Sequence, residues 1–378
     1  MKRCLYKCIA PLLCLSLLTG CSGGGIFTNY REVEELMIVQ TMGFDLTPSK
    51  TAVSISGGGS SGEAKFTRMF TDAKSISGAE QKIQDYSAAE EIFYAHVNYI
   101  AMGRETAKEE LAHCLDFIQR SPQMRMDTPL FVVSNGTAEE LVLGSGNKEY
   151  DATNVLKSLE RNLDTRGDCR IFSAKEVVAN LNKNGSALIC AVKCVKASNA
   201  LEDAKDELTA LPDGYAVIKD KDMIGQISYE DALAVGLIQN EAGPCRITAR
   251  TGSGNATVQL ENCQCKIEPL MNGSELSGLK FDVKLSASLL EYDGSLDVKA
   301  AEASLQKQIE TRLTNVLNMS KLTACDFLQL GGILEARHPI ALSGMSKDFQ
   351  TLLPDIYYII NVSADISRSF DADLEGSP

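Results

Sequence analysis

The sequence predicts a mixed α+β protein with more than one domain. Its 378 residues are enough for two or three domains. In the first half, strand-like runs alternate with segments of helical spacing, and in the second half alternating strands surround one long amphipathic helix. We therefore expect an N-terminal mixed α/β region over residues 30–200, which can divide into two subdomains. We expect a C-terminal α+β domain over residues 212–370, in which an antiparallel sheet packs on a long helix.

The first strands of the N-terminal region form a predicted antiparallel meander. A charged stretch from Thr28 suggests a helical turn that runs into a strand through Met42–Asp45, ending near Pro48. Residues 51–56 alternate between apolar and polar side chains, residues 57–62 are rich in Gly and Ser, and residues 65–71 form another strand-like run. The expected order is strand, strand, loop and strand.

Strands and helices alternate through the remainder of this region. Ile76, Ala79, Ile83 and Tyr86 follow helical spacing, and Thr137 with Glu140 has the spacing of a helix capping box. The further expected elements, in chain order, are a strand over 92–101, a helix with an apolar stripe over 111–118, a strand over 129–133, a helix over 155–163 and a strand over 188–195.

The C-terminal half follows a polar stretch that ends near Pro212. Its clearest strand is 279–290, where apolar residues from Phe281 to Leu289 alternate with polar ones. Leu305, Ile309 and Leu313 indicate an amphipathic helix of about five turns. The other expected elements are strands over 215–219, 223–227, 246–250, 256–261, 263–268 and 356–366, and a helix over 228–238.

The N-terminus has the layout of a bacterial export signal. Three basic residues precede the apolar run Cys8–Leu18, which is shorter than the roughly 20 residues that span a bilayer. Leu18-Thr19-Gly20-Cys21 follows, in the order of a lipobox, in which the Cys21 thiol receives a diacylglyceryl group. We expect residues 1–20 to be a signal peptide, Cys21 to be the lipid attachment site, and residues 21–29 to be a flexible tether.

Composition narrows the classes of partner. The chain carries 37 basic and 50 acidic side chains, a net charge of −13, which disfavours nucleic acid and anionic lipid surfaces. Eight cysteines follow Cys21, an even number that leaves disulfides open. Cys190 and Cys194 are four residues apart on one expected strand, which places them beyond disulfide reach. We interpret most of the eight cysteines as buried apolar side chains. With three histidines and no C-x-x-C pair, we expect neither a metal nor a cofactor.

Motifs that suggest catalysis have simpler structural interpretations. Gly58-Gly59-Ser60-Ser61-Gly62 matches G-x-S-x-G, but a strand-like run follows it rather than the helix that presents a nucleophilic serine. Gly252-Ser253-Gly254 is interpreted as a β-turn, because no basic residue or helix completes a phosphate cradle. His96, His113 and His338 have no companion groups in the sequence that point to catalysis. We therefore expect no enzyme activity.

Several blocks of residues are spread over nearly the whole chain after the lipobox. They are Tyr30–Val39 with Met42-Gly43-Phe44-Asp45, His96 with Gly103–Ala107, Leu115–Arg120 with Met124-Arg125, and Gly214–Lys219 with Ile224-Gly225. Together these blocks resemble the C-subunit lipoproteins of bacterial spore nutrient germinant receptors, the Ger(x)C type. The sequence departs from that family where Ser22 and a glycine tether replace the common Trp-Asp after the cysteine.

The resemblance implies a non-enzymatic role in spore germination. Such a subunit is anchored on the outer face of the spore inner membrane, or cell membrane, and assembles with integral-membrane A- and B-type receptor subunits. Arg31 and Glu32, close to the anchor, are then candidate partner contacts, with a charged first helical turn as the structural alternative. The other function we consider is a solute-binding surface lipoprotein of a transporter, which requires a deep cleft between two similar domains.

Overall fold

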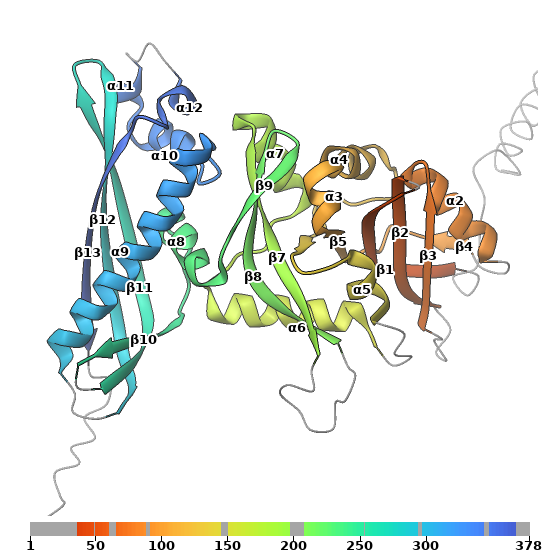
Figure 1. Ribbon diagram of the computed structural model, residues 1–378, viewed down its shortest axis with the longest axis horizontal. Helices are drawn as coiled ribbons and strands as arrows, with labels where there is room; N and C mark the ends of the chain where they lie inside the picture. The colour runs from red at the N-terminus through yellow and green to blue at the C-terminus, as the bar shows by residue number, and fades with distance from the viewer. Residues whose placement is uncertain are drawn as a thin grey trace, which may run out of the picture.

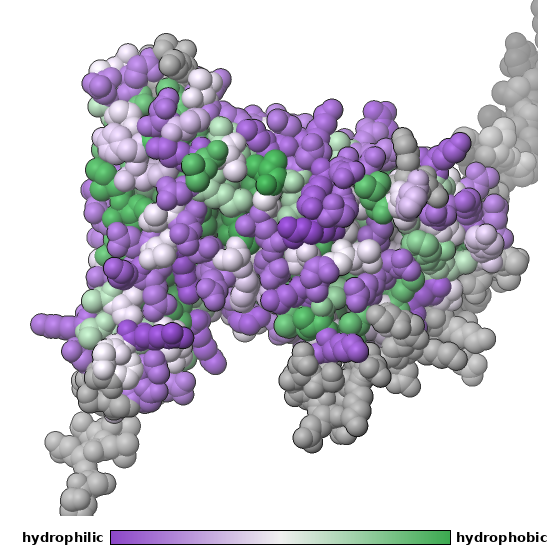
Figure 2. All heavy atoms as spheres, in the orientation of Figure 1, coloured by the Kyte–Doolittle hydropathy of each residue, from purple (hydrophilic) through white to green (hydrophobic). Residues whose placement is uncertain are grey.

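The computed structural model describes residues 36–48, 50–59, 66–87, 91–144, 150–196, 208–252, 254–293, 297–343 and 348–367. Two β-sheets lie at opposite ends of an elongated molecule (Figure 1). Figure 2 shows hydrophilic side chains over most of the visible face, interrupted by separate hydrophobic patches. None of the described helices has the length and apolar character needed to cross a membrane. The architecture is α+β, as the sequence predicts.

The larger sheet has nine strands, with the order β3-β2-β1-β5-β6-β7-β8-β9 and β4 beside β1. The antiparallel meander at one edge is confirmed, and β5, β6 and β7 then add in parallel before β8 and β9 close the sheet in antiparallel pairs. The bounds are β1 Leu36–Thr47, β2 Lys50–Gly59, β3 Phe66–Ala73, β4 Glu91–Phe93, β5 Tyr99–Gly103, β6 Leu130–Val133, β7 Ser186–Lys196, β8 Leu208–Lys219 and β9 Asp222–Ile227.

Side-chain caps define where several helices of this region begin. Ser75, Thr137, Asp151 and Ser173 each accept a hydrogen bond from a backbone N–H of the first turn, which satisfies a donor that the helix leaves free. Of the capping box expected at Thr137 and Glu140, the bond from the Glu140 N–H to the Thr137 side chain is present. The helices are α2 Ile76–Tyr86, α3 Arg104–Glu109, α4 Leu111–Arg120, α5 Ala138–Leu143, α6 Ala152–Arg166 and α7 Ala174–Asn184.

The smaller sheet contains β10 to β13, and α9 lies across one of its faces (Figure 1). Leu305, Ile309 and Leu313 of α9 are fully buried, as their spacing predicts. The aromatic ring of Phe281 packs edge-on against Tyr358. The elements are α8 Tyr229–Gln239, β10 Arg246–Thr251, β11 Gly254–Asn272, β12 Glu275–Tyr292, α9 Val298–Thr323, α10 Leu330–Arg337, α11 Pro339–Leu342, α12 Phe349–Leu352 and β13 Tyr357–Ser367.

Three expected N-terminal elements differ in the structure. The strand expected over 92–101 is divided, because the chain turns at Ala95 and His96 between β4 and β5. The loop expected from Gly57 is strand as far as Gly59. There the absence of a side chain at Gly57 lets the backbones approach, since a Cβ would lie 2.0 Å from the Ile38 carbonyl oxygen. Helix α7 was not expected, although Ser173 and Glu176 form a complete capping box.

The C-terminal sheet differs from the prediction in strand pairing. The strands expected over 256–261 and 263–268 are one strand, β11, with an irregularity between Leu260 and Asn262. The last strand, β13, pairs in parallel with β12, so the sheet is antiparallel only from β10 to β12. Helix α9 has 26 residues, about seven turns rather than five. The long connection through α9 to α12 allows the chain to return and add β13 in parallel.

The division expected near Pro212 falls within β8. Strands β8 and β9 complete the larger sheet, so the chain passes to the smaller sheet only after Ile227. One continuous hydrophobic cluster extends from Met37 to Ile366 and includes residues of both sheets. The expected domain limits, at residues 200 and 212, therefore remain predictions from the sequence.

A buried carboxyl group fastens α10 to the end of α7. Asp326 is 2% exposed and accepts hydrogen bonds from the backbone N–H groups of Leu330 at 2.7 Å and Gly331 at 2.9 Å. The Asn184 amide donates to the Asp326 carbonyl oxygen at 3.0 Å. Burial raises the pKa of Asp326 to about 6, and these hydrogen bonds only partly oppose the rise.

This raised pKa predicts a pH-dependent stability. The folded protein holds the Asp326 proton more tightly than the unfolded chain, so the stabilisation is complete below about pH 4 and is lost as pH rises through about 6. The total is at most about 3 kcal/mol, from about 1.4 kcal/mol per pKa unit. We expect the Tm of the wild type to fall between pH 4 and 6.5 relative to Asp326→Asn. Burial also raises the pKa of Glu80 to about 7. Because Glu80 is present in both proteins, its effect on the pH dependence of Tm is the same in each and drops out of the comparison. Parallel Tm curves would contradict this role of Asp326.

Candidate functional site

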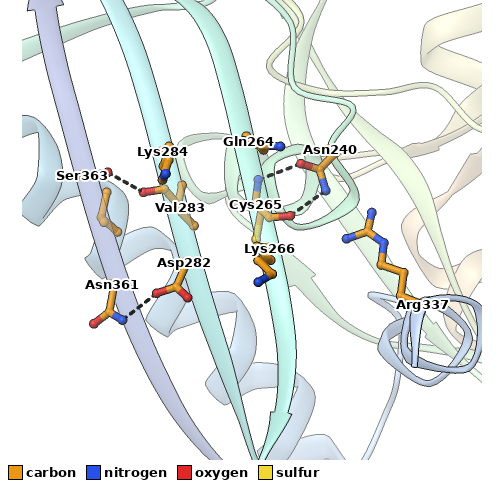
Figure 3. Close-up of a pocket in the computed structure, with 11 residues that line it drawn as sticks. Asn240, Gln264, Cys265, Lys266, Asp282, Val283, Lys284, Arg337, Asn361 and Ser363 are labelled. Carbon is orange, nitrogen blue, oxygen red and sulfur yellow. Dashed lines mark hydrogen bonds between the residues drawn. The ribbon is translucent and has the colours of Figure 1, made fainter. Parts of the chain in front are cut away.

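A hollow of about 830 Å³ lies on the face of the smaller sheet that is turned away from α9, and we call it the outer groove. Three neighbouring strands form its floor, and the ends of α8 and α10 flank it (Figure 3). Because residues from five regions of the sequence meet here, it is a site that only the folded chain creates. Its lining residues are Asn240, Gln264, Cys265, Lys266, Asp282, Val283, Lys284, Arg337, Asn361, Val362 and Ser363.

Strand alternation explains which side chains face the groove. On β12, Phe281, Val283 and Leu285 are buried on the α9 side, so Asp282 and Lys284 point to the other face. The register places Gln264 and Ser363 on either side of Lys284. In the same way, Lys266 and Asn361 lie on either side of Asp282. The floor of the groove is therefore polar across all three strands.

Asn240 covers the free edge of β11 beside the groove. Its side-chain oxygen accepts from the Cys265 N–H at 2.7 Å, and its amide donates to the Cys265 carbonyl at 3.0 Å. This imitates the hydrogen bonds of a neighbouring strand and protects an exposed sheet edge. Asn240 also has a φ of 58° at the end of α8, a conformation that Asn adopts more readily than most residues. Figure 3 shows Arg337 projecting from α10 toward β11.

The charges in the groove are unevenly paired. Asp282 accepts a hydrogen bond from Asn361 at 2.7 Å and forms an ion pair with Lys280 at 2.6 Å. These two contacts lower the pKa of Asp282. Lys266 pairs with Glu268 at 2.5 Å. Lys284 and Arg337 are exposed and have no carboxylate partner among the residues that the structure describes.

This arrangement suits an anionic group better than a cation or an apolar ligand. The two cations without a carboxylate partner can attract a carboxylate or phosphate, and the amides of Gln264 and Asn361 can donate hydrogen bonds. The chain as a whole has a net charge of −13, whereas the groove presents two cations without a carboxylate partner. The groove is therefore locally more attractive to an anion than the charge of the whole chain suggests. It lies open to solvent on the sheet surface (Figure 3), so it suits a segment of another protein as well as a small molecule.

None of the three histidines considered in the sequence lines the outer groove. Cys21, Arg31 and Glu32 fall outside the described residues, so the signal peptide, the tether and the candidate partner contact stay predictions. His96 is in the exposed turn against the ring of Phe93, rather than in a strand. His113 is exposed and lies 3.9 Å from Glu110, and His338 contacts the Ile267 carbonyl oxygen at 3.0 Å. The structure does not bring these histidines into one site.

The glycine motifs contribute to strands. Gly58 and Gly59 belong to β2, while Ser60, Ser61 and Gly62 lie outside the described residues. Gly252 lies in the turn after β10, and Gly254 begins β11, the antiparallel neighbour of β10. Within the described ranges, no three His, Cys, Asp or Glu side chains gather in a way that would hold a metal ion.

Two blocks of the family resemblance meet around Asp45 of β1. The Asp45 carboxylate accepts from the N–H groups of Ala138 at 2.8 Å and Glu139 at 2.7 Å, at the start of α5. Gly103 leaves room for it, because a Cβ there would lie 2.1 Å from the Asp45 Oδ1 atom. Arg104 donates to the Ser134 carbonyl at 3.0 Å and to Gln226 at 3.1 Å. These residues therefore hold the larger sheet and its helices together.

The outer groove itself was not predicted from the sequence. The alternation of Asp282 and Lys284 with buried residues on β12 indicated a polar face, but a solvated surface is the ordinary meaning of that pattern. The groove depends on the parallel addition of β13 and on the positions of Asn240 and Arg337 beside β11. No local signal in the sequence specifies those contacts.

A solved structure with the same fold defines the class of protein. The structure described as the crystal structure of the GerBC protein has a TM-score of 0.57 and 14% identity, and the match covers 89% of this chain and 99% of that chain. At this identity, the likeness establishes a shared fold. The class is thus defined by the fold that this chain shares with that protein.

Comparisons of the sequence then identify the family. The model for the spore germination protein N-terminal domain matches residues 29–193. The model for the spore germination B3/GerAC-like C-terminal domain matches residues 213–370. The spore germination protein KC of Bacillus subtilis (strain 168) is 24% identical, and the match covers 98% of this chain and 96% of that protein. The chain belongs to the GerAC-type family of spore germination proteins, which confirms the resemblance inferred from its sequence blocks.

Proposed function

We propose that this protein is a membrane-anchored lipoprotein subunit of a spore nutrient germinant receptor. It acts without catalysis, through assembly with integral-membrane A- and B-type receptor subunits at the outer face of the membrane. The observation that carries the proposal is the ordered match of both germination-protein domains over residues 29–193 and 213–370. The lipobox at Leu18–Cys21 supports the anchor, because acyl chains attached there would hold a chain whose described helices do not span a membrane.

The outer groove is the surface that we propose for contact with an anionic segment of a receptor partner. Lys284 and Arg337 supply charge that the described residues leave without a carboxylate. Complementary charge guides association and selects the partner more than it adds affinity. Arg31 and Glu32, near the anchor, are proposed as a second contact.

The transporter alternative has less support. A solute-binding lipoprotein encloses its ligand between two similar domains, whereas the two sheets here have nine and four strands. The cavity beside the connection between them, lined by Cys169, Tyr215 and Gly243, is about 190 Å³. This is below the range of about 300–1,000 Å³ that is usual for ligand pockets.

The test is complementation of a deletion strain. Spores without the gene should fail to germinate with the nutrient that this receptor senses, and the wild-type gene should restore the response. A groove variant with Lys284→Glu and Arg337→Glu should recover about tenfold less of the integral-membrane subunits in co-purification, because charge repulsion opposes association. Spores that carry this groove variant should also germinate less with the nutrient, because fewer complete receptors assemble.

The matched control reverses two exposed lysines of α9, Lys299→Glu and Lys307→Glu, away from the groove. It changes the net charge by the same amount and should restore germination fully. Equal loss in both variants would mean that overall charge, not the groove, matters. Normal germination of the deletion strain with every nutrient, in a genome without a paralogue, would refute the receptor function.

A further inference from the structure

Two buried cysteines lie next to each other where the connection between α6 and α7 packs against the larger sheet. The Sγ atoms of Cys169 and Cys190 are 4.0 Å apart. Cys190 is at the centre of β7 and fully buried, while Cys169 is 6% exposed, in the connection between α6 and α7. The Cys169 thiol also points toward the Gly214 carbonyl oxygen of β8, at 3.7 Å. The two thiols therefore converge from separate parts of the fold.

A disulfide requires the two sulfur atoms to approach to about 2.05 Å. At 4.0 Å, the two sulfur atoms of the thiol form must approach each other by about 2 Å for the bond to form. Cys190 and Cys194, which share one strand, cannot be joined in this way because residues four apart on a strand are about 13 Å apart. Tertiary folding thus places Cys169 close to Cys190 as a possible disulfide partner, whereas no cysteine on the same strand is close enough.

The segment that carries Cys169 connects the two ends of the molecule. We call residues 167–170 the joint segment. The Gly243 N–H donates to the Gly167 carbonyl at 2.9 Å, and Tyr229 of α8 donates to Asp168 at 2.5 Å. Arg170 forms an ion pair with Glu241 at 2.6 Å. These partners belong to α8 and the chain that leads into the smaller sheet, so the position of the joint segment affects how that sheet is held.

We propose that Cys169 and Cys190 form a disulfide bond that fastens the joint segment to β7. The expectation that the bond is present in the native protein rests on the proposed export, because disulfides persist in oxidising compartments outside the cytosol. The bond would limit the movement of the joint segment relative to the larger sheet. It would stabilise the fold mainly by restricting the unfolded chain between residues 169 and 190.

The chemistry needs an oxidant of the small-disulfide class, RSSR. Cys169 is the residue that such a molecule can reach, because it lines the cavity of about 190 Å³ together with Arg170 and Tyr215. Its thiolate attacks one sulfur of RSSR and releases RS⁻, which leaves a mixed disulfide on Cys169. The Cys190 thiolate then attacks the Cys169 sulfur and releases the second RS⁻. The two protein thiols lose two protons and two electrons, and RSSR becomes two RSH.

The test uses the full-length protein, purified in detergent under reducing conditions and then treated with oxidised glutathione. Non-reducing digestion and mass spectrometry should find a peptide pair that joins Cys169 to Cys190 and is lighter by two hydrogen atoms. The oxidised protein should gain several degrees in Tm, and dithiothreitol should reverse the gain. Cys169→Ala and Cys190→Ala should each abolish both the linked peptide and the redox-dependent shift, whereas Cys114→Ala, at another buried cysteine, should keep them.

The contradicting results are equally specific. Recovery of Cys169 and Cys190 as separately alkylated thiols after oxidation would overturn the proposal, as would a glutathione adduct that remains on Cys169. Alkylation of intact membranes before lysis then tests the compartment. If the disulfide forms in the purified protein but the two thiols are free in membranes, the disulfide proposal is supported and the exported location is not. The two hypotheses can therefore fail separately.

Discussion

Replacement of Cys21 by alanine should abolish incorporation of labelled fatty acid. The thiol is the only atom of the lipobox that can receive the diacylglyceryl group, so no partial activity is expected. The protein should then be released from the membrane or remain as an uncleaved precursor, because one chain contributes about 0.8 kcal/mol per buried methylene and stable anchoring needs two such chains. Labelling with palmitate and fractionation of membranes measure both effects.

Two comparisons make the Cys21 result interpretable. Cys14→Ala, within the apolar run and upstream of the expected cleavage site, should leave labelling unchanged. The Cys21→Ala strain should also show the germination defect of the deletion if the anchor positions the subunit for assembly. Continued fatty-acid incorporation into Cys21→Ala would refute the anchor.

Replacement of Asp45 by alanine should destabilise the larger sheet strongly. Two charge-assisted hydrogen bonds to the start of α5 are lost, and each contributes roughly 1.5 kcal/mol or more. The N–H groups of Ala138 and Glu139 then have no acceptor near the positive end of the helix dipole. We expect the free energy of unfolding to fall by about 3 kcal/mol. Thermal unfolding should then show a Tm lower by roughly 6–12 °C.

The control for Asp45 is Asp85→Ala, which removes an exposed carboxylate of α2 and should change Tm by little. Asp45→Asn keeps the side-chain shape and one acceptor, so its loss should lie between those of the other two variants. An Asp45→Ala protein as stable as the wild type would show that Asp45 does not hold α5 in place.

Local patterns predicted many of the individual elements. The alternation on β12 and the helical spacing of α2 and α9 correctly indicated their type and their buried sides, except that Tyr86 at the end of α2 is exposed. Errors occurred where a distant contact changes the local preference. The turn at His96 interrupts an apolar run, and the strand at Gly57 depends on close approach to the backbone of Ile38. Sequence resemblance also led to the family that the comparisons confirm.

The sequence by itself determined the α+β class, the family and the expectation of an export signal that ends just before Cys21. These depend on residues close together in the chain, or on blocks compared with relatives. Tertiary structure alone decided that β13 joins β12 in parallel, that Lys284 and Arg337 border one groove, and that Cys169 lies beside Cys190. The physical reason is that strand pairing and helix packing bring together residues far apart in sequence, and periodicity carries no information about which segments meet.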